Sequence, residues 1–411
     1  MRVTEIEVHP IWPEYGDWIA YALQHYYGPQ SRTVYVVHTD TGLVGLGEGH
    51  GTESDEVLDR YRDSNPFDWI GDETSLALGT AMYDLMGQAA GVPVYQLFGP
   101  RQRSWVPVGS WTVSTHPERM AEAVRHYAAQ GYTWLKYHLS PFENVFDQTE
   151  AMQAVAPAGF RLHYDFTMHG TDDHMPDLLT RLARYPVAGC FEDPLPGEDL
   201  DGYIELRQRV HLPIVLHHFP TRATYEVFRR PADAYMLGHA HIGDAVRRAG
   251  LFAAANMPFM LQNTGGHITR AMILHMMAAF PSATFHFFSD TEAAGSDVVR
   301  ERWEPVEGRL RVPEAPGLGV TLDRAELERL EQRRPAPQAP WIVKSTFAGG
   351  ARMYNLHDPA NSLFMVRPDL RREITLSYAA PISTQYWDDD GSPTFAAMKA
   401  RLERGGMVLE K

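Results

Sequence analysis

Apolar and polar positions along this 411-residue chain change their period several times, and each change marks an expected element. Alternation over 3–12 and 32–51 predicts strands, and the sequence TDTG within the second stretch supplies a hairpin turn. The intervening segment 13–30 is rich in aromatics and glycine, which is typical of a binding loop. Helical spacing then predicts a helix over 75–91, ended by Gly91. Strands followed by a helix indicate an α+β unit.

From Trp105 onward, short apolar runs alternate with amphipathic segments. The segments 116–131 and 177–186 have helical periodicity. Strand, helix and strand in series predict a parallel sheet, and eight such strands predict closure into a barrel. A flat doubly wound sheet is the competing topology, but no glycine-rich phosphate loop follows the first strand. The eight predicted strands are 105–111, 132–139, 160–166, 187–194, 213–219, 233–241, 258–264 and 284–290.

The pattern changes again after about Leu330. The segment 331–340 is a proline-rich connector. Strand-like runs follow at 361–368 and 373–381, so the remainder of the chain is expected to be folded rather than a tail.

Composition narrows the class of partner. A formal net charge of -15 argues against nucleic acid and against an anionic membrane surface, because either would require a basic patch. The single cysteine, Cys190, excludes an internal disulfide and leaves the redox compartment open, with a reducing cytoplasm favoured. The first residues have no apolar signal core, and no run is long enough to span a membrane. We therefore expect a cytoplasmic protein that acts on a small molecule.

The run 131–140 carries Lys136 and His138 two residues apart. Side chains i and i+2 of a strand point to the same side, so the two groups are expected to share one face. Lys136 is the only lysine before Lys344, in a chain that otherwise uses arginine. Lysine differs from arginine in having an adjustable pKa, which favours a chemical role. The alternative is a strand end where a snorkelling lysine lies beside a surface histidine.

Residues able to bind a metal fall at the ends of the predicted strands, where parallel barrels carry their chemistry. Asp165 and Glu192 end two consecutive strands, and one further strand-helix period reaches His217 and His218. Two carboxylates suit Mg²⁺, whereas an imidazole as third ligand shifts the preference toward Mn²⁺, Fe²⁺ or Zn²⁺. Each residue alone has an ordinary explanation, as a helix N-cap or as a histidine satisfied by its neighbours.

Several motifs taken together resemble the enolase superfamily, in its mandelate racemase and muconate lactonizing branch. The resemblance covers roughly residues 1 to 330. Its most specific part is the pattern DLxGxxxGxPVYxLxG, which is long enough to be informative by itself. The motifs are TDTGLVGLGEG at 39–49, AMYDLMGQAAGVPVYQLFGP at 81–100, GYTWLKYH at 131–138, FEDPLP at 191–196 and VPEAPGLGV at 312–320.

The resemblance implies an α/β fold in which an α+β capping domain closes a modified, (β/α)7β-like TIM barrel. We expect the capping domain at 1–104, the barrel at 105–310, a return segment to the cap at 311–334 and a partly β C-terminal extension at 335–411. Family members are often oligomers, so a homo-oligomer is expected. The extension has no counterpart in the resemblance and is a candidate for an oligomer contact or for completing a neighbour's active site.

Site roles follow from the same resemblance, position by position. Asp165 and Glu192 match the first two metal ligands of the family, and His218, or His217, occupies the place of the third. Mg²⁺ is the expected metal and would grip a substrate carboxylate. Lys136 and His138 align with a Lys-x-Lys motif, so Lys136 is expected to hold the carboxylate and His138 to exchange the substrate proton.

The chain departs from the family on the sixth and seventh strands, where Gly238 and Gln262 replace the usual acid or base. Two-base racemisation is therefore disfavoured, and we expect dehydration of a hydroxy acid or sugar acid through an ene-diolate. Racemase, epimerase and cycloisomerase activities remain alternatives, as do other chemistry on a transition metal and a binding module that has lost the reaction. The expected substrate-binding residues, several of which could instead simply pack the cap onto the barrel, are Trp18, Tyr21, His25, His50, His239, Gln262 and Asn263.

Overall fold

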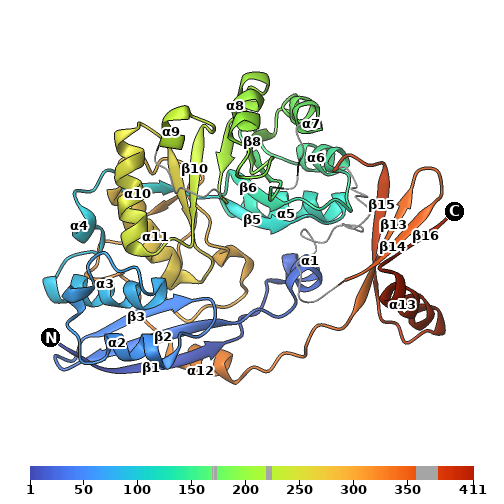
Figure 1. The fold of residues 1–411 in the computed structure, drawn as a ribbon. Helices are drawn as coiled ribbons and strands as arrows, with labels where there is room; N and C mark the ends of the chain where they lie inside the picture. The colour runs from blue at the N-terminus through green and yellow to red at the C-terminus, as the bar shows by residue number, and fades with distance from the viewer. Residues whose placement is uncertain (169, 171–173, 219–224, 358–377) are drawn as a thin grey trace.

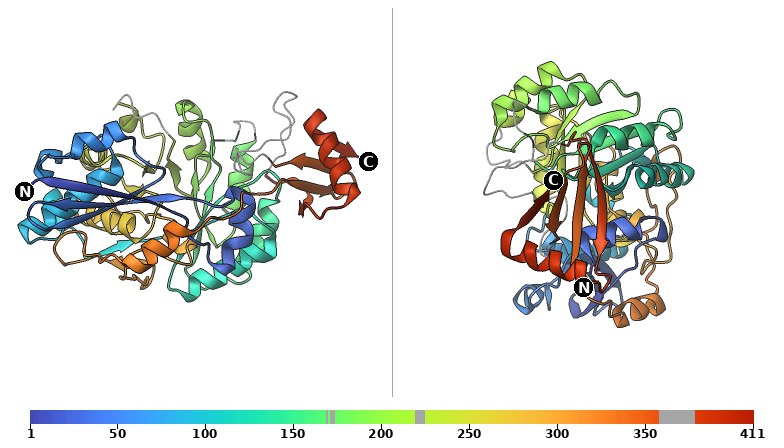
Figure 2. Two further views of the ribbon diagram at one scale, coloured as in Figure 1. Left: turned by 90° about the horizontal axis from the view of Figure 1, so that it is seen from below. Right: turned by 90° about the vertical axis from the view of Figure 1, so that its right-hand side faces the viewer.

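The computed structural model describes residues 1–168, 170, 174–218, 225–357 and 378–411. These residues form a three-stranded cap sheet, a curled seven-stranded parallel sheet, a two-stranded sheet and a four-stranded C-terminal sheet (Figure 1). The N-terminus lies at the cap and the C-terminus at the opposite end of the molecule, as the left view of Figure 2 shows. The fold expected from the sequence, a modified barrel with an α+β cap, is confirmed.

The cap sheet is antiparallel, in the order β1 (Val3–Ile11), β2 (Arg32–Thr39), β3 (Val44–Gly49). Helix α3 (Leu76–Ala90) packs on β3, and a β-carbon at Gly47 would lie only 2.1 Å from the carbonyl oxygen of Ala77. Glycine in this strand therefore lets the helix approach the sheet closely. The predicted hairpin and the predicted helix are both confirmed. The remaining short elements of the cap are α2 (Asp55–Tyr61), a 3-10 turn (Pro66–Trp69) and α4 (Tyr95–Phe98).

The segment 13–30, expected to be a loop, contains helix α1 (Asp17–Tyr27). Ile19, Leu23 and Tyr26 are buried at helical spacing, and Gly28 ends the helix with a positive φ of 64°. The flanking glycines and the many aromatics concealed this period in the sequence. In Figure 1 the helix lies between the barrel and the C-terminal sheet, so it is positioned to connect them.

The parallel sheet has the strand order β11-β10-β9-β8-β7-β6-β5, which is the order of a barrel wound in sequence. Its strands are β5 (Ser110–Val113), β6 (Trp134–His138), β7 (Arg161–Asp165), β8 (Ala188–Glu192), β9 (Ile214–Leu216), β10 (Ala234–Gly238) and β11 (Phe259–Gln262). The expected eighth strand does not form a full strand. Bridges from Phe287 to Val108 and from Phe288 to Gln262 nevertheless join the two edges of the sheet and close the barrel.

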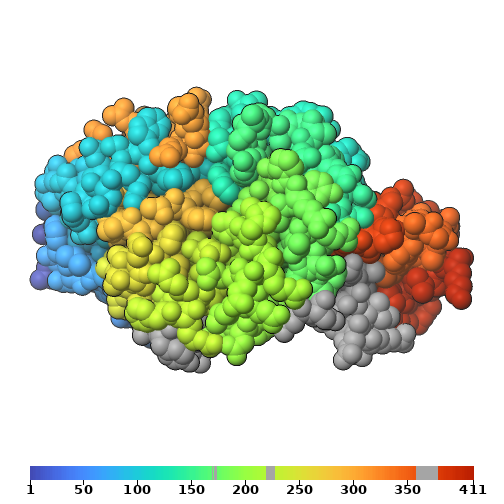
Figure 3. Space-filling view, turned by 90° about the horizontal axis from the view of Figure 1, so that it is seen from above, coloured from blue at the N-terminus to red at the C-terminus, as the bar shows by residue number. Residues whose placement is uncertain are grey.

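Helices cover the outside of this barrel (Figure 1), and the green and yellow parts of the chain form one continuous face in the space-filling view of Figure 3. They are α5 (Pro117–Ala129), α6 (Val145–Gln153), α7 (Met175–Leu182), α8 (Leu200–Arg209), α9 (Tyr225–Arg229), α10 (Ile242–Ala254) and α11 (His267–Ala279). Three further short elements belong to this part of the chain. A 3-10 turn spans Thr291–Ala293, and β4 (Trp105–Pro107) pairs with β12 (Arg309–Arg311).

After the barrel the chain returns to the cap, where α12 (Arg324–Gln332) packs against β1. The extended connector then leads to the C-terminal sheet, β15 (Ile382–Asp388), β13 (Trp341–Phe347), β14 (Arg352–Leu356), β16 (Met407–Glu410). Trp341 faces α1 and the barrel, whereas Ile342 faces α13 (Pro393–Gly405), as expected for alternating strand residues.

The predicted strand at 361–368 lies outside the described residues, and so does most of the one at 373–381. The exact limits of the four expected parts stay a prediction. None of the described helices is both long and apolar enough to cross a membrane.

Candidate active site at the mouth of the barrel

The register of the parallel strands places three of the predicted site residues side by side across the sheet. His138 on β6 pairs with Asp165 on β7, and Asp165 pairs with Glu192 on β8. All three lie at the carboxyl ends of their strands. Lys136, two residues before His138, points into the same space and is only 1% exposed. The structure therefore gathers Lys136, His138, Asp165 and Glu192 as the sequence pattern predicted.

The ammonium of Lys136 lies between two buried carboxylates. Its Nζ is 3.0 Å from Asp165 Oδ2 and 2.7 Å from Glu192 Oε1. Burial acts to lower the pKa of Lys136, but the charges of Asp165 and Glu192 more than offset it, so the pKa is raised. Lys136 is consequently a fixed cation, suited to holding a carboxylate and unsuited to accepting a proton.

Two imidazoles also contact the carboxylate of Glu192. Besides Lys136, it meets His163 Nε2 at 2.6 Å and His217 Nδ1 at 2.9 Å. Burial alone would raise the pKa of Glu192, but Lys136 and the two imidazoles hold it well below its usual range. The carboxylate therefore stays ionised in a fixed orientation, as a metal ligand must.

The two candidates for the third ligand take different partners. His217 contacts Glu192, whereas His218 Nδ1 lies 2.7 Å from Asp193 Oδ2. That hydrogen bond to Asp193 raises the pKa of His218. Ligand atoms of Asp193, His217 and His218 all lie within 4.8 Å of one another. The structure thus places His217 beside the predicted ligand Glu192, and His218 one step toward solvent.

Gly238 explains how His217 can reach this position. A β-carbon at Gly238 would lie 2.0 Å from His217 Nε2. Gly238 is the sixth-strand position at which the expected acid or base is missing. The imidazole of His217 from the neighbouring strand fills the space that a side chain there would occupy.

His138 is held at both ring nitrogens. Its Nε2 lies 3.0 Å from Asp165 Oδ2, and its Nδ1 lies 3.2 Å from the hydroxyl of Tyr27 on α1. Because Asp165 is an ionised acceptor, Nε2 carries the proton and Nδ1 accepts from the Tyr27 hydroxyl. The lone pair of Nδ1 thus faces the cap. Sequence reasoning missed Tyr27, although its four-residue spacing from Leu23 on α1 would have placed both on one face.

A cavity of about 530 Å³ opens in front of these groups. The cap contributes Tyr15, Leu23 and Tyr27, the strand ends contribute His138 and His217, and the closing segment contributes Asp290. The predicted binding residues His50, His239 and Gln262 also line it. A pocket between the cap and the strand ends is the usual place for a small ligand in such a barrel.

Trp18, Tyr21 and His25, which were predicted to bind substrate, do not line this cavity. Trp18 stacks on His126, the guanidinium of Arg119 lies over the ring of Tyr21, and His25 Nε2 meets Asp388 Oδ1 at 2.9 Å. The described cavity wall takes Leu23 and Tyr27 from α1, so these three side chains face α5 and the C-terminal sheet instead. Asn263 is buried beside Gln262 and lies behind the described wall.

Asp290 is a second group that sequence reasoning missed. Its Oδ2 accepts a hydrogen bond of 3.0 Å from Thr264 Oγ1, while Oδ1 is buried without a hydrogen-bond partner among the described residues. Burial raises the pKa of Asp290, which favours the protonated acid. A carboxyl group on the cavity wall with one unused oxygen is suited to donating a proton.

Backbone strain is concentrated at this mouth. Thr167, Met168, Asp193, His239 and Asp290 all have φ between 43° and 61° and follow strand ends or the closing segment. Such conformations cost on the order of 1–3 kcal/mol each in non-glycine residues and cluster at functional sites.

Burial and nearby histidines lower the pKa of His239 to about 4, so its imidazole on the cavity wall is neutral.

A family model described as enolase C-terminal domain-like matches residues 119–326, half of the chain. The chain belongs to the enolase superfamily, in its mandelate racemase and muconate lactonizing branch. The resemblance seen in the sequence is confirmed.

Relatives in this superfamily include lyases and isomerases. The cis-3-hydroxy-L-proline dehydratase of Roseibium aggregatum is 25% identical, over 74% of this chain and 80% of its own length. The D-galactonate dehydratase of Ralstonia nicotianae is 27% identical, over 62% of this chain and 72% of its own length. A muconate cycloisomerase is related to a similar degree. A solved enolase from Thermobispora bispora, complexed with magnesium and formate, shares the fold with a TM-score of 0.67 at 24% identity, covering 81% of this chain and 93% of its own.

Enolase-superfamily enzymes use a divalent metal, and the donor set of this chain fits one. Asp165 and Glu192 are adjacent buried carboxylates. The space between them suits a positive charge, since the ammonium of Lys136 contacts both. Oxygen ligands of this kind suit Mg²⁺, and the imidazole of His217 beside Glu192 also admits Mn²⁺.

Proposed function

We propose that this enzyme removes the proton next to a carboxylate and expels a β-hydroxyl group, which makes it a dehydratase of a small hydroxy acid or sugar acid. The arrangement of Lys136, Asp165 and Glu192 beside His138, at the wall of a cavity, carries the proposal. Dehydratases among its relatives support the reaction class.

Substrate binding would use the charges at the base of the cavity. The ammonium of Lys136 attracts the carboxylate and stabilises the negative charge that develops when the α-proton leaves. Asp165, Glu192 and His217, or His218, would hold the divalent metal, with Mg²⁺ favoured. When bound, the metal polarises the substrate carboxylate and stabilises an ene-diolate.

Proton transfer is assigned to His138 and Asp290. Binding of the substrate would displace the Tyr27 hydroxyl from Nδ1 of His138, the nitrogen that does not face Asp165. The carbon-hydrogen bond then breaks and its proton goes to this nitrogen. The carbon-oxygen bond at the β-position then breaks, and the departing hydroxyl takes the proton of Asp290 and leaves as water. For a 2,3-dihydroxy acid the enol that remains becomes a 2-keto acid, which can be measured directly.

The test is a screen of monocarboxylic and dicarboxylic hydroxy acids for 2-keto acid formation in the presence of Mg²⁺. We expect turnover of at least one acid, and we expect His138→Ala to reduce it by about 10²–10⁴-fold, the usual contribution of a general base. Unchanged turnover in His138→Ala would remove the base assignment. No turnover of any acid, with no solvent exchange of an α-proton, would favour a binding module.

Asp290 also supports a second candidate, an epimerase or racemase. Such a reaction requires two proton-exchanging groups, and Asp290 supplies one besides His138 on the wall of the same cavity. Nuclear magnetic resonance in D₂O separates the two reactions. Inversion at the α-carbon with deuterium incorporation and without loss of water would indicate the isomerase.

A small carboxylate is the proposed partner. We also propose that the protein is cytoplasmic and forms a homo-oligomer.

The C-terminal extension supports the site within one chain. The hydroxyl of Tyr378 donates a hydrogen bond of 3.2 Å to the carbonyl of Phe166, the residue after Asp165. It thereby supports the end of β7 from outside the barrel.

A further inference from the structure

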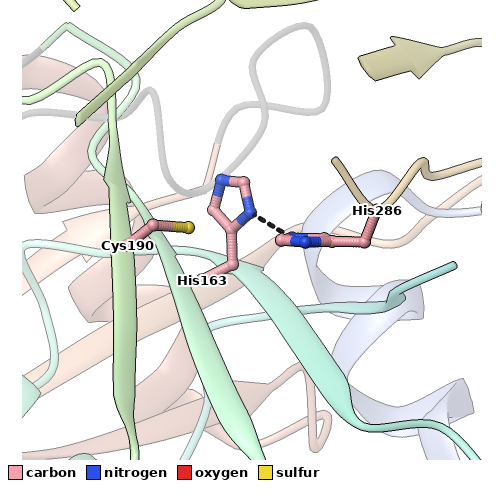
Figure 4. Close-up of side chains that lie close together, drawn as sticks. All are labelled: His163, Cys190 and His286. Atoms are coloured by element: carbon pink, nitrogen blue, oxygen red, sulfur yellow. Dashed lines mark hydrogen bonds between the residues drawn. The ribbon is translucent and has the colours of Figure 1, made fainter. Parts of the chain in front are cut away.

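A second group of metal-binding side chains lies inside the barrel. His163 on β7, Cys190 on β8 and His286 on the closing segment each contribute one ligand atom, and these atoms lie within 4.8 Å of one another (Figure 4). His163 and Cys190 are fully buried, and His286 is 4% exposed. The interior of such a barrel is normally filled by branched aliphatic side chains, so this polar layer is a departure that packing does not require.

Neighbouring groups orient the two imidazoles toward each other. His163 Nε2 lies 2.6 Å from Glu192 Oε2, so that nitrogen carries the proton and Nδ1 has the lone pair. His163 Nδ1 in turn lies 2.9 Å from His286 Nε2. The ring of Trp134 stacks on His286 at 4.0 Å and fixes its plane. A carboxylate behind an imidazole is the arrangement that commonly orients and strengthens a histidine ligand.

We propose that His163, Cys190 and His286 form a binding site for Zn²⁺ or a similar transition-metal ion, separate from the divalent site at the mouth. Two imidazoles and a thiolate are ligands for Zn²⁺ and are unsuited to Mg²⁺ or Ca²⁺. This inference does not depend on the proposed function.

Metal binding requires small movements and two proton transfers: the proton of His286 moves from Nε2 to Nδ1, and the Cys190 thiol releases its proton to solvent. With bonds of about 2.0 Å to nitrogen and about 2.3 Å to sulfur, tetrahedral geometry puts the ligand atoms roughly 3.3–3.6 Å apart. The two histidine nitrogens must therefore move apart by a few tenths of an ångström, and the sulfur must approach by up to about 1.3 Å. A bound ion would tie β7, β8 and the closing segment together and would restrain Glu192 through His163.

Titration of the full-length, tag-free protein with Co²⁺ tests the site, because a thiolate bound to Co²⁺ gives a charge-transfer band in the near ultraviolet. The chain has a single cysteine, so any such band reports Cys190. We expect the band in the wild type with one Co²⁺ per chain, and we expect Zn²⁺ to displace it. Cys190→Ser should abolish the band. It should also weaken metal binding at this site by at least about 10–100-fold, because loss of a group that only hydrogen-bonds to a ligand already costs that much.

His218→Gln is the matched control, since it alters the Asp193, His217 and His218 group and leaves the interior layer intact. We expect this variant to keep the band. Absence of the band from folded wild-type protein at millimolar Co²⁺ would overturn the proposal without reliance on any variant. A band that His218→Gln removed and His286→Gln left unchanged would also contradict it.

Discussion

The hydroxyl of Tyr27 lies 3.2 Å from Nδ1 of His138, so a side chain of the cap contacts the imidazole assigned to proton transfer. The contact joins two elements more than a hundred residues apart in the sequence. Asp165 contacts the other nitrogen, Nε2, which carries the proton, so Nδ1 is the nitrogen that accepts from Tyr27.

Replacing Tyr27 with Phe should lower kcat by about 10-fold, because one hydrogen bond of roughly 0.5–1.5 kcal/mol that orients His138 is lost. KM should change less, since the carboxylate is held by Lys136 and the metal. Steady-state kinetics on the substrate found in the screen measures both constants. Tyr21→Phe, on the opposite face of α1, is the control and should leave kcat unchanged. Equal effects of the two substitutions would show that Tyr27 acts only through packing.

Gly238→Ala should displace His217 and destabilise the protein by about 1–3 kcal/mol, the usual cost of overpacking. The β-carbon would lie 2.0 Å from His217 Nε2, and the contact between His217 and Glu192 would be lost. Denaturant unfolding and metal-binding calorimetry measure the two effects. Gly250→Ala on α10, where a β-carbon meets nothing within 4 Å, should instead stabilise by roughly 0.5–1 kcal/mol. A neutral Gly238→Ala would mean that His217 moves freely.

Lys136→Met should destabilise the metal-free protein by about 3–5 kcal/mol at neutral pH, because two buried carboxylates lose their cation. In the wild type the pKa values of Asp165 and Glu192 are lowered, so they contribute stability above their ordinary pKa of about 4 and lose it as pH falls. In the variant those pKa values rise, so the carboxylates cost stability above pH ~4. The difference between the two proteins should therefore be large at pH 7 and shrink toward pH 4.

Chemical unfolding at several pH values, with chelator present, measures this difference. Lys399→Met is the control, because Lys399 is a partly exposed residue of α13 that pairs with Glu403 four residues on. Its effect should be within about 0.5 kcal/mol at each pH. If the difference in unfolding free energy between the wild type and Lys136→Met did not vary with pH, the effect of the substitution would be steric rather than electrostatic.

Asp290→Asn should slow loss of water by about 10²-fold or more, the lower range for a general acid, and leave α-proton exchange with D₂O in place. The reason is that proton removal by His138 precedes the step that needs Asp290. A substrate analogue with fluoride in place of the β-hydroxyl should restore elimination, because fluoride departs without a proton. Loss of exchange together with elimination would place Asp290 in substrate binding.

Much of this site followed from short-range patterns. Strand periodicity put Lys136 and His138 on one face, and the strand-helix repeat brought Asp165 and Glu192 to the same end of the barrel. The missing acid or base at Gly238 was also visible. Trp18, Tyr21 and His25 do not line the cavity, because the helical period of α1, which the sequence analysis did not recognise, decides which aromatic side chains face it.

The sequence by itself determined the barrel, the cap and the end of the barrel at which four ionisable side chains meet, because periods of two and 3.6 residues and a regular repeat encode them locally. Only the tertiary structure decided that His217 rather than His218 contacts Glu192, that Tyr27 reaches His138, and that Asp290 faces the cavity. Those contacts depend on left-handed turns after the strands and on the approach of elements far apart in the chain. A repeating pattern of apolar positions carries no information about either.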